Sequence, residues 1–367
     1  MRITGIGEVG AIDGESLEGL IFKAASGALA DAELTRGELD GVVISASDQI
    51  DGRAISSMLT SGPAGAYLNE EINVASSPGH ALALAWMQIA SGTHRRLLVS
   101  SWGKASESAG ASSEAAERLS TEPFFERGAG LTRIAAAGLQ AQAHRASRGD
   151  PGKAEQAAAS VAARNHAGAV SVEQVLASAH VAAPLRALEC PAELDGAFSL
   201  VIEDAGRPRT PGVNIEGLAW CADSGRIAER DLVGLPHLRR AAGRALFHAG
   251  IKDAGAEVAV WELHDYSPDA EIAAYSAIGL CAAERALDCA LGEDADGGIA
   301  ARVNPLGGSV AGEAPFGGPL RKVLAAVRHV RGGPGAAEQR GVMRAGAQIS
   351  SGFAGQFQSV FLLGREE

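Results

Sequence analysis

Two adjacent serines stand where a nucleophile could act. The stretch INVASSPGHALALAWMQIAS, residues 72–91, begins like a buried strand, breaks at Ser-Pro-Gly and continues as an apolar helix. It brings Ser76 and Ser77 to a helix N-terminus and contains no cysteine. Because a serine hydroxyl barely ionises near neutral pH, Ser76 needs a base to take its proton. His80 could reach the same cleft or could cap a turn, and we favour the structural role.

Three further side chains could move protons. His264 and Tyr266, in the sequence ELHDYS, follow a predicted strand. His264 either lines a site or is a structural histidine at a strand-to-helix turn, and spacing alone leaves both open. A tyrosine such as Tyr266 transfers protons only when its pKa and geometry are adjusted. Glu313 would serve as a carboxylate base if it were desolvated, although an exposed loop acid is the commoner outcome.

Composition excludes several classes of partner. The chain has 367 residues, a net charge of −12 and only 4% aromatic residues. An acidic chain with few stacking side chains is unsuited to nucleic acid. The local run HLRRAAGR, residues 237–244, is interpreted as the solvated face of a helix. No stretch of about 18 apolar residues occurs, so we expect no membrane span.

The four cysteines predict a reducing compartment. None forms a C-x-x-C pair or lies at metal-ligand spacing from histidines, so we expect neither disulfides nor a metal site. The first residues lack the apolar core of a signal peptide. We therefore expect a cytoplasmic location.

Short apolar strands alternate with longer helices, which predicts an α/β fold with a largely parallel sheet. A helical insertion is expected over residues 103–184, because that region is rich in Ala, Ser, Glu and Arg. Strands are predicted at residues 2–7, 40–46, 95–102, 196–205 and 356–364, and helices at 16–32, 151–169 and 319–330.

The second half repeats the first. AASGALADAELTRGELDGVVI, starting at Ala24, aligns with AAGRALFHAGIKDAGAEVAVW, starting at Ala241, an offset of about 217. Each copy reads as a helix, a short turn and a buried strand. A repeat on this scale predicts two similar halves with a cleft at their junction.

At this point the chain resembles the thiolase superfamily, and within it the sterol-carrier-protein-type thiolases and lipid-transfer thiolase-like proteins. The resemblance covers nearly the whole length. It rests on the opening RITGIGEV, on ELHDYSPDAEIAAYSAIGLC at residues 262–281, and on NPLGGSVAGEAPFGG at residues 304–318. The last run does not match a dinucleotide-binding G-x-G-x-x-G; in the family its glycines let the main chain approach a coenzyme A (CoA) thioester.

The resemblance implies duplicated thiolase-like halves at residues 1–205 and 206–367, in a five-layered α-β-α-β-α arrangement. It implies that Ser76 replaces the nucleophilic cysteine, with Gly79 as the glycine of that motif. It places His264 in an oxyanion hole. The other substrate-binding positions that it implies are Asn304, Gly307, Gly308, Glu313, Ser351 and Gly352.

Two reactive positions depart from the family pattern. The histidine of its Gly-His-Pro box falls on Ala314, followed by Pro315. The terminal cysteine box reads AQISSGFAGQF, which offers Ser350 and Ser351. The resemblance implies carbon–carbon bond chemistry on an acyl-CoA thioester, of aldol, retro-aldol or Claisen type. Without the cysteine we favour an aldol or retro-aldol step, with His264 stabilising the enolate and Tyr266, Glu313 or water carrying the proton. An acyl-serine route through Ser76 lacks an evident base.

Two alternatives remain open at this point. The chain could be a non-catalytic subunit of an active thiolase, or an acyl-CoA or lipid carrier. The resemblance implies a homodimer or a heteromer with a second thiolase-like chain, and a possible small protein with a zinc ribbon and an OB fold. CoA is expected only as part of the substrate, with no covalently bound cofactor. Arg164 and Arg186 could contact its phosphates, although solvation at the surface is commoner.

Overall fold

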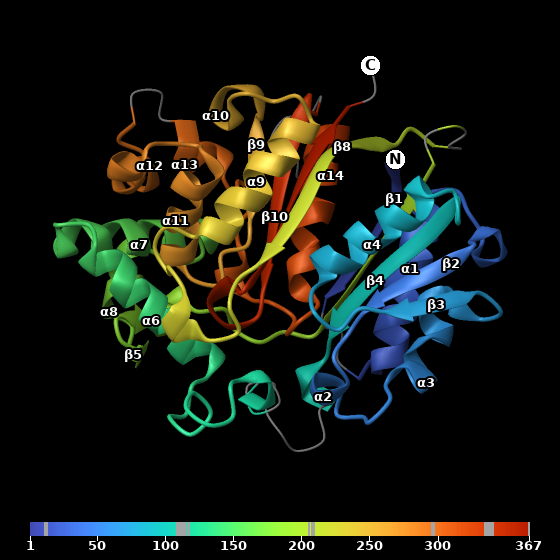
Figure 1. Cartoon of the computed structure of the whole chain (residues 1–367), viewed down its shortest axis with the longest axis horizontal. Helices are drawn as coiled ribbons and strands as arrows, with labels where there is room; N and C mark the ends of the chain where they lie inside the picture. Colours follow the sequence, from blue (N-terminus) through green and yellow to red (C-terminus); the bar gives the residue numbers. More distant parts are fainter. Residues whose placement is uncertain are drawn as a thin grey trace.

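One mixed sheet runs through the molecule (Figure 1). The computed structural model describes residues 1–10, 14–107, 115, 118–204, 206, 210–294, 298–333 and 341–365. Within them the sheet has nine strands in the order β3-β2-β4-β7-β1-β8-β11-β10-β9. The strands are β1 (Arg2–Gly10), β2 (Gly41–Ser45), β3 (Glu70–Asn73), β4 (Arg96–Gly103), β7 (Gly196–Glu203), β8 (Val213–Ala222), β9 (Val260–Leu263), β10 (Arg344–Ser351) and β11 (Phe357–Gly364).

The strand order repeats when it is read outward from the middle. β1 and β8 meet through two residue pairs only, Arg2 with Asn214 and Ile3 with Val213. Outward from β1 come β7, β4 and β2, and outward from β8 come β11, β10 and β9. A duplicated unit produces such an order. The predicted boundary between residues 205 and 206 adjoins residues 205 and 207–209, which lie outside the described residues, so it stays a prediction.

The sheet is not largely parallel, so that prediction is wrong. Parallel pairs are β2 with β3, β2 with β4 and β9 with β10, whereas the other pairs are antiparallel. β10 and β11 are joined by only a few residues, and so short a connection permits only antiparallel pairing. β3, predicted as a buried strand, is an edge strand whose four residues are all exposed.

Helices and sheet form five layers, which confirms the predicted fold class. α1 (Leu17–Asp31) packs on β1 and β7, and α9 (Pro236–His248) packs on β8 and β11. α4 (Pro78–Ala90) and α14 (Arg321–Arg331) each contact strands on the β1 side and on the β8 side of the sheet. They therefore lie between the two sets of strands. Three separate apolar clusters fill the spaces between these layers.

Close strand-to-helix approach recurs in both halves. A Cβ on Gly5 of β1 would lie 2.0 Å from the Ala28 carbonyl oxygen in α1. A Cβ on Gly217 of β8 would lie 2.1 Å from the Ala245 carbonyl oxygen in α9. Ala28 and Ala245 are related by the same offset of 217 residues that the sequence repeat shows. Glycine at both strand positions therefore lets an outer helix sit directly on the backbone.

The region predicted as a helical insertion contains α6 (Arg133–Ala146), α7 (Pro151–Asn165) and α8 (Val172–Ala177). It also contains a small sheet of β5 (His180–Ala182) and β6 (Leu185–Arg186). α6 and α7 pack on α11 of the C-terminal part. The remaining α-helices within the described ranges are α2 (Asp48–Asp51), α3 (Ser57–Thr60), α10 (Ala254–Glu257), α11 (Pro268–Ile278), α12 (Ala286–Leu291) and α13 (Gly298–Arg302).

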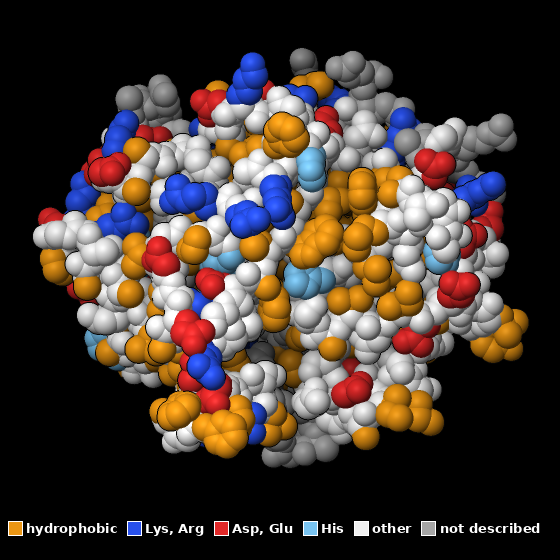
Figure 2. All heavy atoms as spheres, viewed as in Figure 1, with side chains coloured by type: hydrophobic (Ala, Val, Ile, Leu, Met, Phe, Trp, Pro, Cys, Tyr) orange, Lys and Arg blue, Asp and Glu red, His pale blue; other side chains and the backbone are white. Residues whose placement is uncertain are grey.

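On the face in Figure 2, arginine side chains and a group of apolar side chains gather over different helices. Arginine side chains gather over α9, where Arg239, Arg240 and Arg244 are exposed. The basic run is thus the solvated face of a helix, as predicted. Hydrophobic side chains gather over α4, where Met87 is 39% exposed. Within the described part of the chain, no helix is both long and apolar enough to cross a membrane.

Candidate functional site

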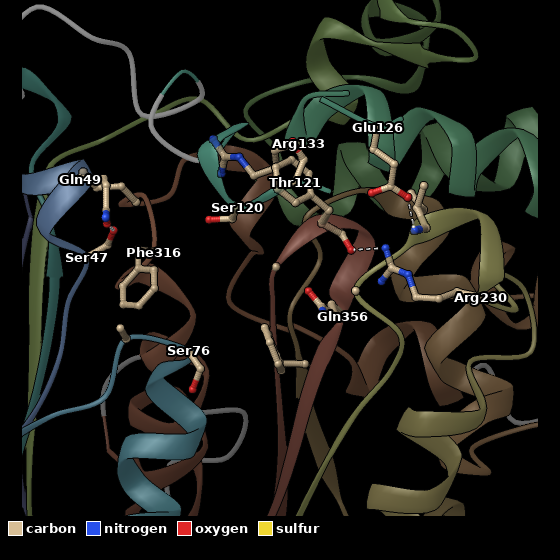
Figure 3. Close-up of a pocket in the computed structure, with 17 residues that line it drawn as sticks. Ser47, Gln49, Ser76, Ser120, Thr121, Glu126, Arg133, Arg230, Phe316 and Gln356 are labelled. Carbon is tan, nitrogen blue, oxygen red and sulfur yellow. Dashed lines mark hydrogen bonds between the residues drawn. The ribbon is translucent and has the colours of Figure 1, made fainter. Parts of the chain in front are cut away.

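A cavity of about 720 Å³ opens at the start of α4 and the turn between β10 and β11 (Figure 3). Ser76, just before the N-cap of α4, is among the residues that line the cavity. The aromatic rings of Phe316, Phe353 and Phe357 supply part of an apolar lining. Gly352, predicted to bind substrate, lies in the wall with a φ of +74°, a backbone conformation that favours glycine.

Two guanidinium groups and one carboxylate also line the cavity. Arg230 donates from Nη2 to the Phe353 carbonyl at 2.8 Å, whereas its Nε and Nη1 atoms are buried and have no hydrogen-bond partner among the described residues. Burial lowers the pKa of Arg230. Arg133 pairs with Glu193 at 3.1 Å, and the Glu126 carboxylate accepts from the Ile227 amide at 2.6 Å. The cavity thus offers cationic donors beside apolar walls.

Ser76 has the base that sequence reasoning did not assign to it. Its Oγ lies 2.9 Å from Nδ1 of His80, one helical turn further along. The His80 ring packs edge-on against Phe357 at 5.5 Å, and its Nε2 is buried without a hydrogen-bond partner among the described residues. Burial lowers the pKa of His80, which favours the neutral ring that can accept a proton. The available signal was a histidine four residues after Ser76, in the first turn of the helix that Ser77 caps.

Two other serines link the two halves of the sheet: Ser77, which follows Ser76, and Ser351, the last residue of β10. Ser77 is the N-cap of α4 and accepts a hydrogen bond from the Gly79 amide at 3.2 Å. Ser351 donates to Ser77 Oγ at 3.0 Å. A Cβ on Gly79 would lie 2.5 Å from Ser359 Oγ, so Gly79 permits close packing of α4 on β11 and is buried rather than lining the cavity.

His264 lies directly after β9 and is not among the described residues that line the cavity. Its Nδ1 lies 2.7 Å from Ser350 Oγ, and its Nε2 lies 2.9 Å from Glu313 Oε2. The side chains of His264 and Glu313 are only 6% and 7% exposed. Glu313 is therefore not an exposed loop acid. Burial alone would raise its pKa, but His264 and the Ser309 hydroxyl outweigh burial and lower it.

A buried polar network fixes the loop that carries Glu313. The Asp265 carboxylate accepts from the Ser309 amide at 2.7 Å and from Lys322 Nζ at 3.0 Å. Burial would raise the pKa of Asp265, yet Lys322 and these hydrogen bonds lower it. Lys322 also donates to Asn304 Oδ1 at 3.0 Å. A Cβ on Gly308 would come within 1.9 Å of the Asp265 carboxylate.

Three predicted substrate-binding positions belong to this network instead of the cavity wall. Asn304 is fully buried, and its amide donates to Glu271 at 2.8 Å. Gly307, with a φ of +103°, and Gly308 pack against Asn165 of α7. Their role in this structure is to hold the loop on the helical region. The ligand contacts that the resemblance implies for these positions stay a prediction, and none of the three is among the described residues that line the cavity.

Other candidates are engaged in packing. Tyr266 donates from its hydroxyl to Gln140 Oε1 at 2.6 Å, and burial raises its pKa well above the ordinary tyrosine value, which opposes proton release. Arg164 pairs with Glu271 at 2.8 Å and Arg186 with Glu155 at 2.9 Å. Ala314 is buried. All four cysteines are free, and none is among the described residues of the cavity wall.

Comparisons with known proteins agree with this architecture. Residues 221–365 match the family described as Thiolase C-terminal domain-like. A solved structure named Ltp2-ChsH2(DUF35) aldolase has a TM-score of 0.78 at 20% identity, covering 99% of this chain and 97% of that one. The fold is thiolase-like.

A second solved structure is similar over the whole of this chain. The monomeric SCP2-thiolase like protein type 1 from Mycobacterium smegmatis has a TM-score of 0.71 at 20% identity, covering 100% of this chain and 77% of that one. No curated protein matches the sequence. Identity this low establishes the thiolase-like fold, and the chemistry must be argued from the site of this chain.

Proposed function

We propose that the chain belongs to the thiolase superfamily and acts on acyl-CoA thioesters, breaking or forming a carbon–carbon bond by a retro-aldol or aldol step. The observation that carries the proposal is the contact of His264 Nε2 with Glu313 Oε2 at 2.9 Å. It sets a hydrogen-bond donor beside an ionised carboxylate in a nearly dry site. Such preorganised pairs are effective where charge develops in a transition state.

The tautomer of His264 follows from its two neighbours. If Ser350 donates to Nδ1, the ring proton is on Nε2 and points at the carboxylate. In the proposed cleavage, Glu313 takes the proton of a 3-hydroxyl group. The bond between C2 and C3 breaks, C3 becomes a carbonyl carbon, and the electron pair forms the enolate of the shortened thioester. His264 Nε2–H stabilises the enolate oxygen, and protonated Glu313 returns the proton to C2.

The buried network serves this step by positioning. Lys322 and the Ser309 amide fix Asp265, the residue after His264, while Gly307 and Gly308 hold the Glu313 loop on α7. Ser76 and the aromatic rings would border the acyl part of the substrate, and Arg133 and Arg230 would contact its anionic groups. Tyr266 takes no part in this proposal, because its hydroxyl is bound to Gln140.

The test is cleavage of 3-hydroxyacyl-CoA substrates by the purified chain, with shortened acyl-CoA measured by chromatography. Glu313→Gln keeps the side-chain shape but cannot take the proton. We expect it to lower kcat by at least about 10²-fold. The matched control is Glu155→Gln, because Glu155 pairs with Arg186 at the surface, 40% exposed. Unchanged turnover in Glu313→Gln would overturn the proposed mechanism.

A second candidate, a non-catalytic subunit, is favoured by the absence of a cysteine from the described cavity wall and by the buried methyl group of Ala314. The similar Ltp2-ChsH2(DUF35) aldolase carries two components in its name. Under this reading the chain assembles with another thiolase-like chain or with a small OB-fold and zinc-ribbon protein. Turnover seen only after a cysteine-bearing thiolase partner is added would support the subunit role.

A further inference from the structure

Arg230 brings to the cavity wall a positive charge that pairs with no carboxylate among the described residues. Its Nη2 donates to the Phe353 carbonyl at 2.8 Å, while its Nε and Nη1 are buried without a hydrogen-bond partner there. We propose that Arg230 binds a carboxylate at the far end of the acyl chain, so that the substrate is the CoA thioester of a dicarboxylic acid. The thioester rests on the proposed function, and the second acid group is new.

The carboxylates nearest to Arg230 are engaged elsewhere. Asp223 Oδ2 lies 3.1 Å from Nδ1 of His237, and Glu126 accepts from the Ile227 amide at 2.6 Å. Burial lowers the pKa of Arg230, although Asp223 and Glu126 attract its charge and partly oppose the shift. A cation that burial penalises in this way is stabilised by an anionic ligand, and charge-assisted hydrogen bonds are among the strongest in proteins.

The charges of the wall suit one carboxylate better than the phosphates of CoA. Arg133, a second arginine of the wall, already pairs with Glu193 at 3.1 Å. The pyrophosphate and the 3′-phosphate of CoA carry several negative charges, which the Glu126 carboxylate in the same wall would repel. A single carboxylate is balanced by the single charge of Arg230. We therefore expect the phosphates of CoA to lie outside this cavity.

The shape of the cavity allows an acyl chain to reach Arg230. In Figure 3, Gln356 lies between Ser76 and Arg230. Phe353 and Phe357 also line the cavity, and their rings suit a run of methylene groups. A guanidinium Nη atom carries two hydrogens, so Nη2 can bind a carboxylate oxygen while it holds the Phe353 carbonyl. A chain that extends from the side of Ser76 would place its terminal carboxylate there.

The test measures the binding of CoA, hexanoyl-CoA and adipyl-CoA to the purified chain by calorimetry. Adipyl-CoA has a carboxylate where hexanoyl-CoA has its terminal methyl group, and neither has the 3-hydroxyl group that the proposed cleavage requires. We expect adipyl-CoA to bind about tenfold more tightly than hexanoyl-CoA. Arg230→Gln should remove this difference and leave the affinity for hexanoyl-CoA unchanged. The matched control is Arg226→Gln, because Arg226 is 58% exposed and pairs with Glu229, and it should keep the tenfold preference.

Two further variants separate loss of the charge from damage to the fold. Arg230→Lys keeps the positive charge, and we expect it to retain the preference for adipyl-CoA to within about threefold. Glu126→Gln removes the negative charge beside Arg230 but keeps an oxygen for the Ile227 amide. We expect it to bind adipyl-CoA about threefold more tightly and hexanoyl-CoA with unchanged affinity.

Three outcomes would overturn the proposal. The first is equal affinity of the native chain for hexanoyl-CoA and adipyl-CoA, or no binding of either. The second is a preference for adipyl-CoA that persists in Arg230→Gln. The third is an equal loss of affinity for all three ligands in Arg230→Gln, which would show that Arg230 binds a phosphate of CoA. The proposed carbon–carbon cleavage is judged separately, from turnover of 3-hydroxyacyl-CoA, so hexanoyl-CoA binding without the preference would leave that function standing.

Discussion

His80 and His264 each bond to a serine hydroxyl, yet their surroundings are opposite. His80 bonds to Ser76, which lines the cavity, and its buried Nε2 has no partner among the described residues, whereas both nitrogens of His264 are bonded within a network of buried charges. Nearby carboxyl groups differ in the same way. Burial raises the pKa of Asp51, on the N-terminal side, whereas Lys322 outweighs burial at Asp265. On the C-terminal side, ion pairs and hydrogen bonds hold His264 and Asp265 in place. On the N-terminal side, His80 and Asp51 have fewer such contacts among the described residues.

The largest expected effect is the loss of stability when Lys322, on the C-terminal side, is replaced. Lys322→Met would leave Asp265 buried without its cation, and breaking such a pair costs about 3–5 kcal/mol. The free energy of unfolding in urea measures this loss. The matched control is Lys153→Met, because Lys153 pairs with Asp288 where both side chains are 35% exposed, and we expect a much smaller loss from such an exposed pair. Equal losses would remove the contrast between the two sides.

The next effect is a pH dependence of the stability, caused by Asp51 on the N-terminal side. Burial raises the pKa of Asp51 from 3.8 to about 6, despite hydrogen bonds from Trp102 and Ser56. The folded state therefore keeps a proton that the unfolded chain has lost between these values. The stability contribution is complete below about pH 4 and is lost as pH rises through about 6, by about 3 kcal/mol.

Asp51→Asn tests this dependence, because the amide keeps an oxygen for the Trp102 N–H, which lies 3.1 Å from the carboxylate. The difference in unfolding free energy between the native chain and Asp51→Asn should move in the variant's favour from pH 4 to pH 7. A difference that stays constant with pH would contradict the assignment.

The smallest expected effect concerns Tyr266. Tyr266→Phe removes the hydroxyl that donates to Gln140 at 2.6 Å, and the loss of that hydrogen bond should cost about 1 kcal/mol of stability. Cleavage of 3-hydroxyacyl-CoA should change less than about threefold, since Tyr266 moves no proton here. A loss near 10²-fold would make Tyr266 the proton carrier and transfer that role away from Glu313.

The layered fold was predictable because it depends on local patterns. Ser16 and Ser77 cap α1 and α4 as serines before apolar periodic runs should. β8 and β10 were not recognised as strands from the sequence alone. Their sequences, VNIEGLAWCA and RAGAQISS, alternate in part, but many of their positions are Gly or Ala, residues that are depleted in strands. Only the pairing of β10 with β11 follows from a short connection, whereas the other antiparallel pairs join strands far apart in the sequence, which no local pattern reports.

The site was predictable only in part. Ser76 lies among the residues that line the cavity, while its catalytic role stays a prediction, and its contact with His80 joins two residues four positions apart in the sequence. The contact of His264 with Glu313 joins residues 49 positions apart, and no periodicity reports such a pair. The sequence named Asn304, Gly307 and Gly308 by resemblance, but only packing shows that they hold a loop in place.

The most direct test of the central claim is cleavage of a 3-hydroxyacyl-CoA by the native chain and by Glu313→Gln under single-turnover conditions. The account predicts a shortened acyl-CoA and a carbonyl product from the native chain, with a rate constant about 10²-fold lower in the variant and unchanged in Glu155→Gln. Cleavage at the native rate by Glu313→Gln would contradict it. Cleavage that appears only when a cysteine-bearing partner chain is added would contradict it equally.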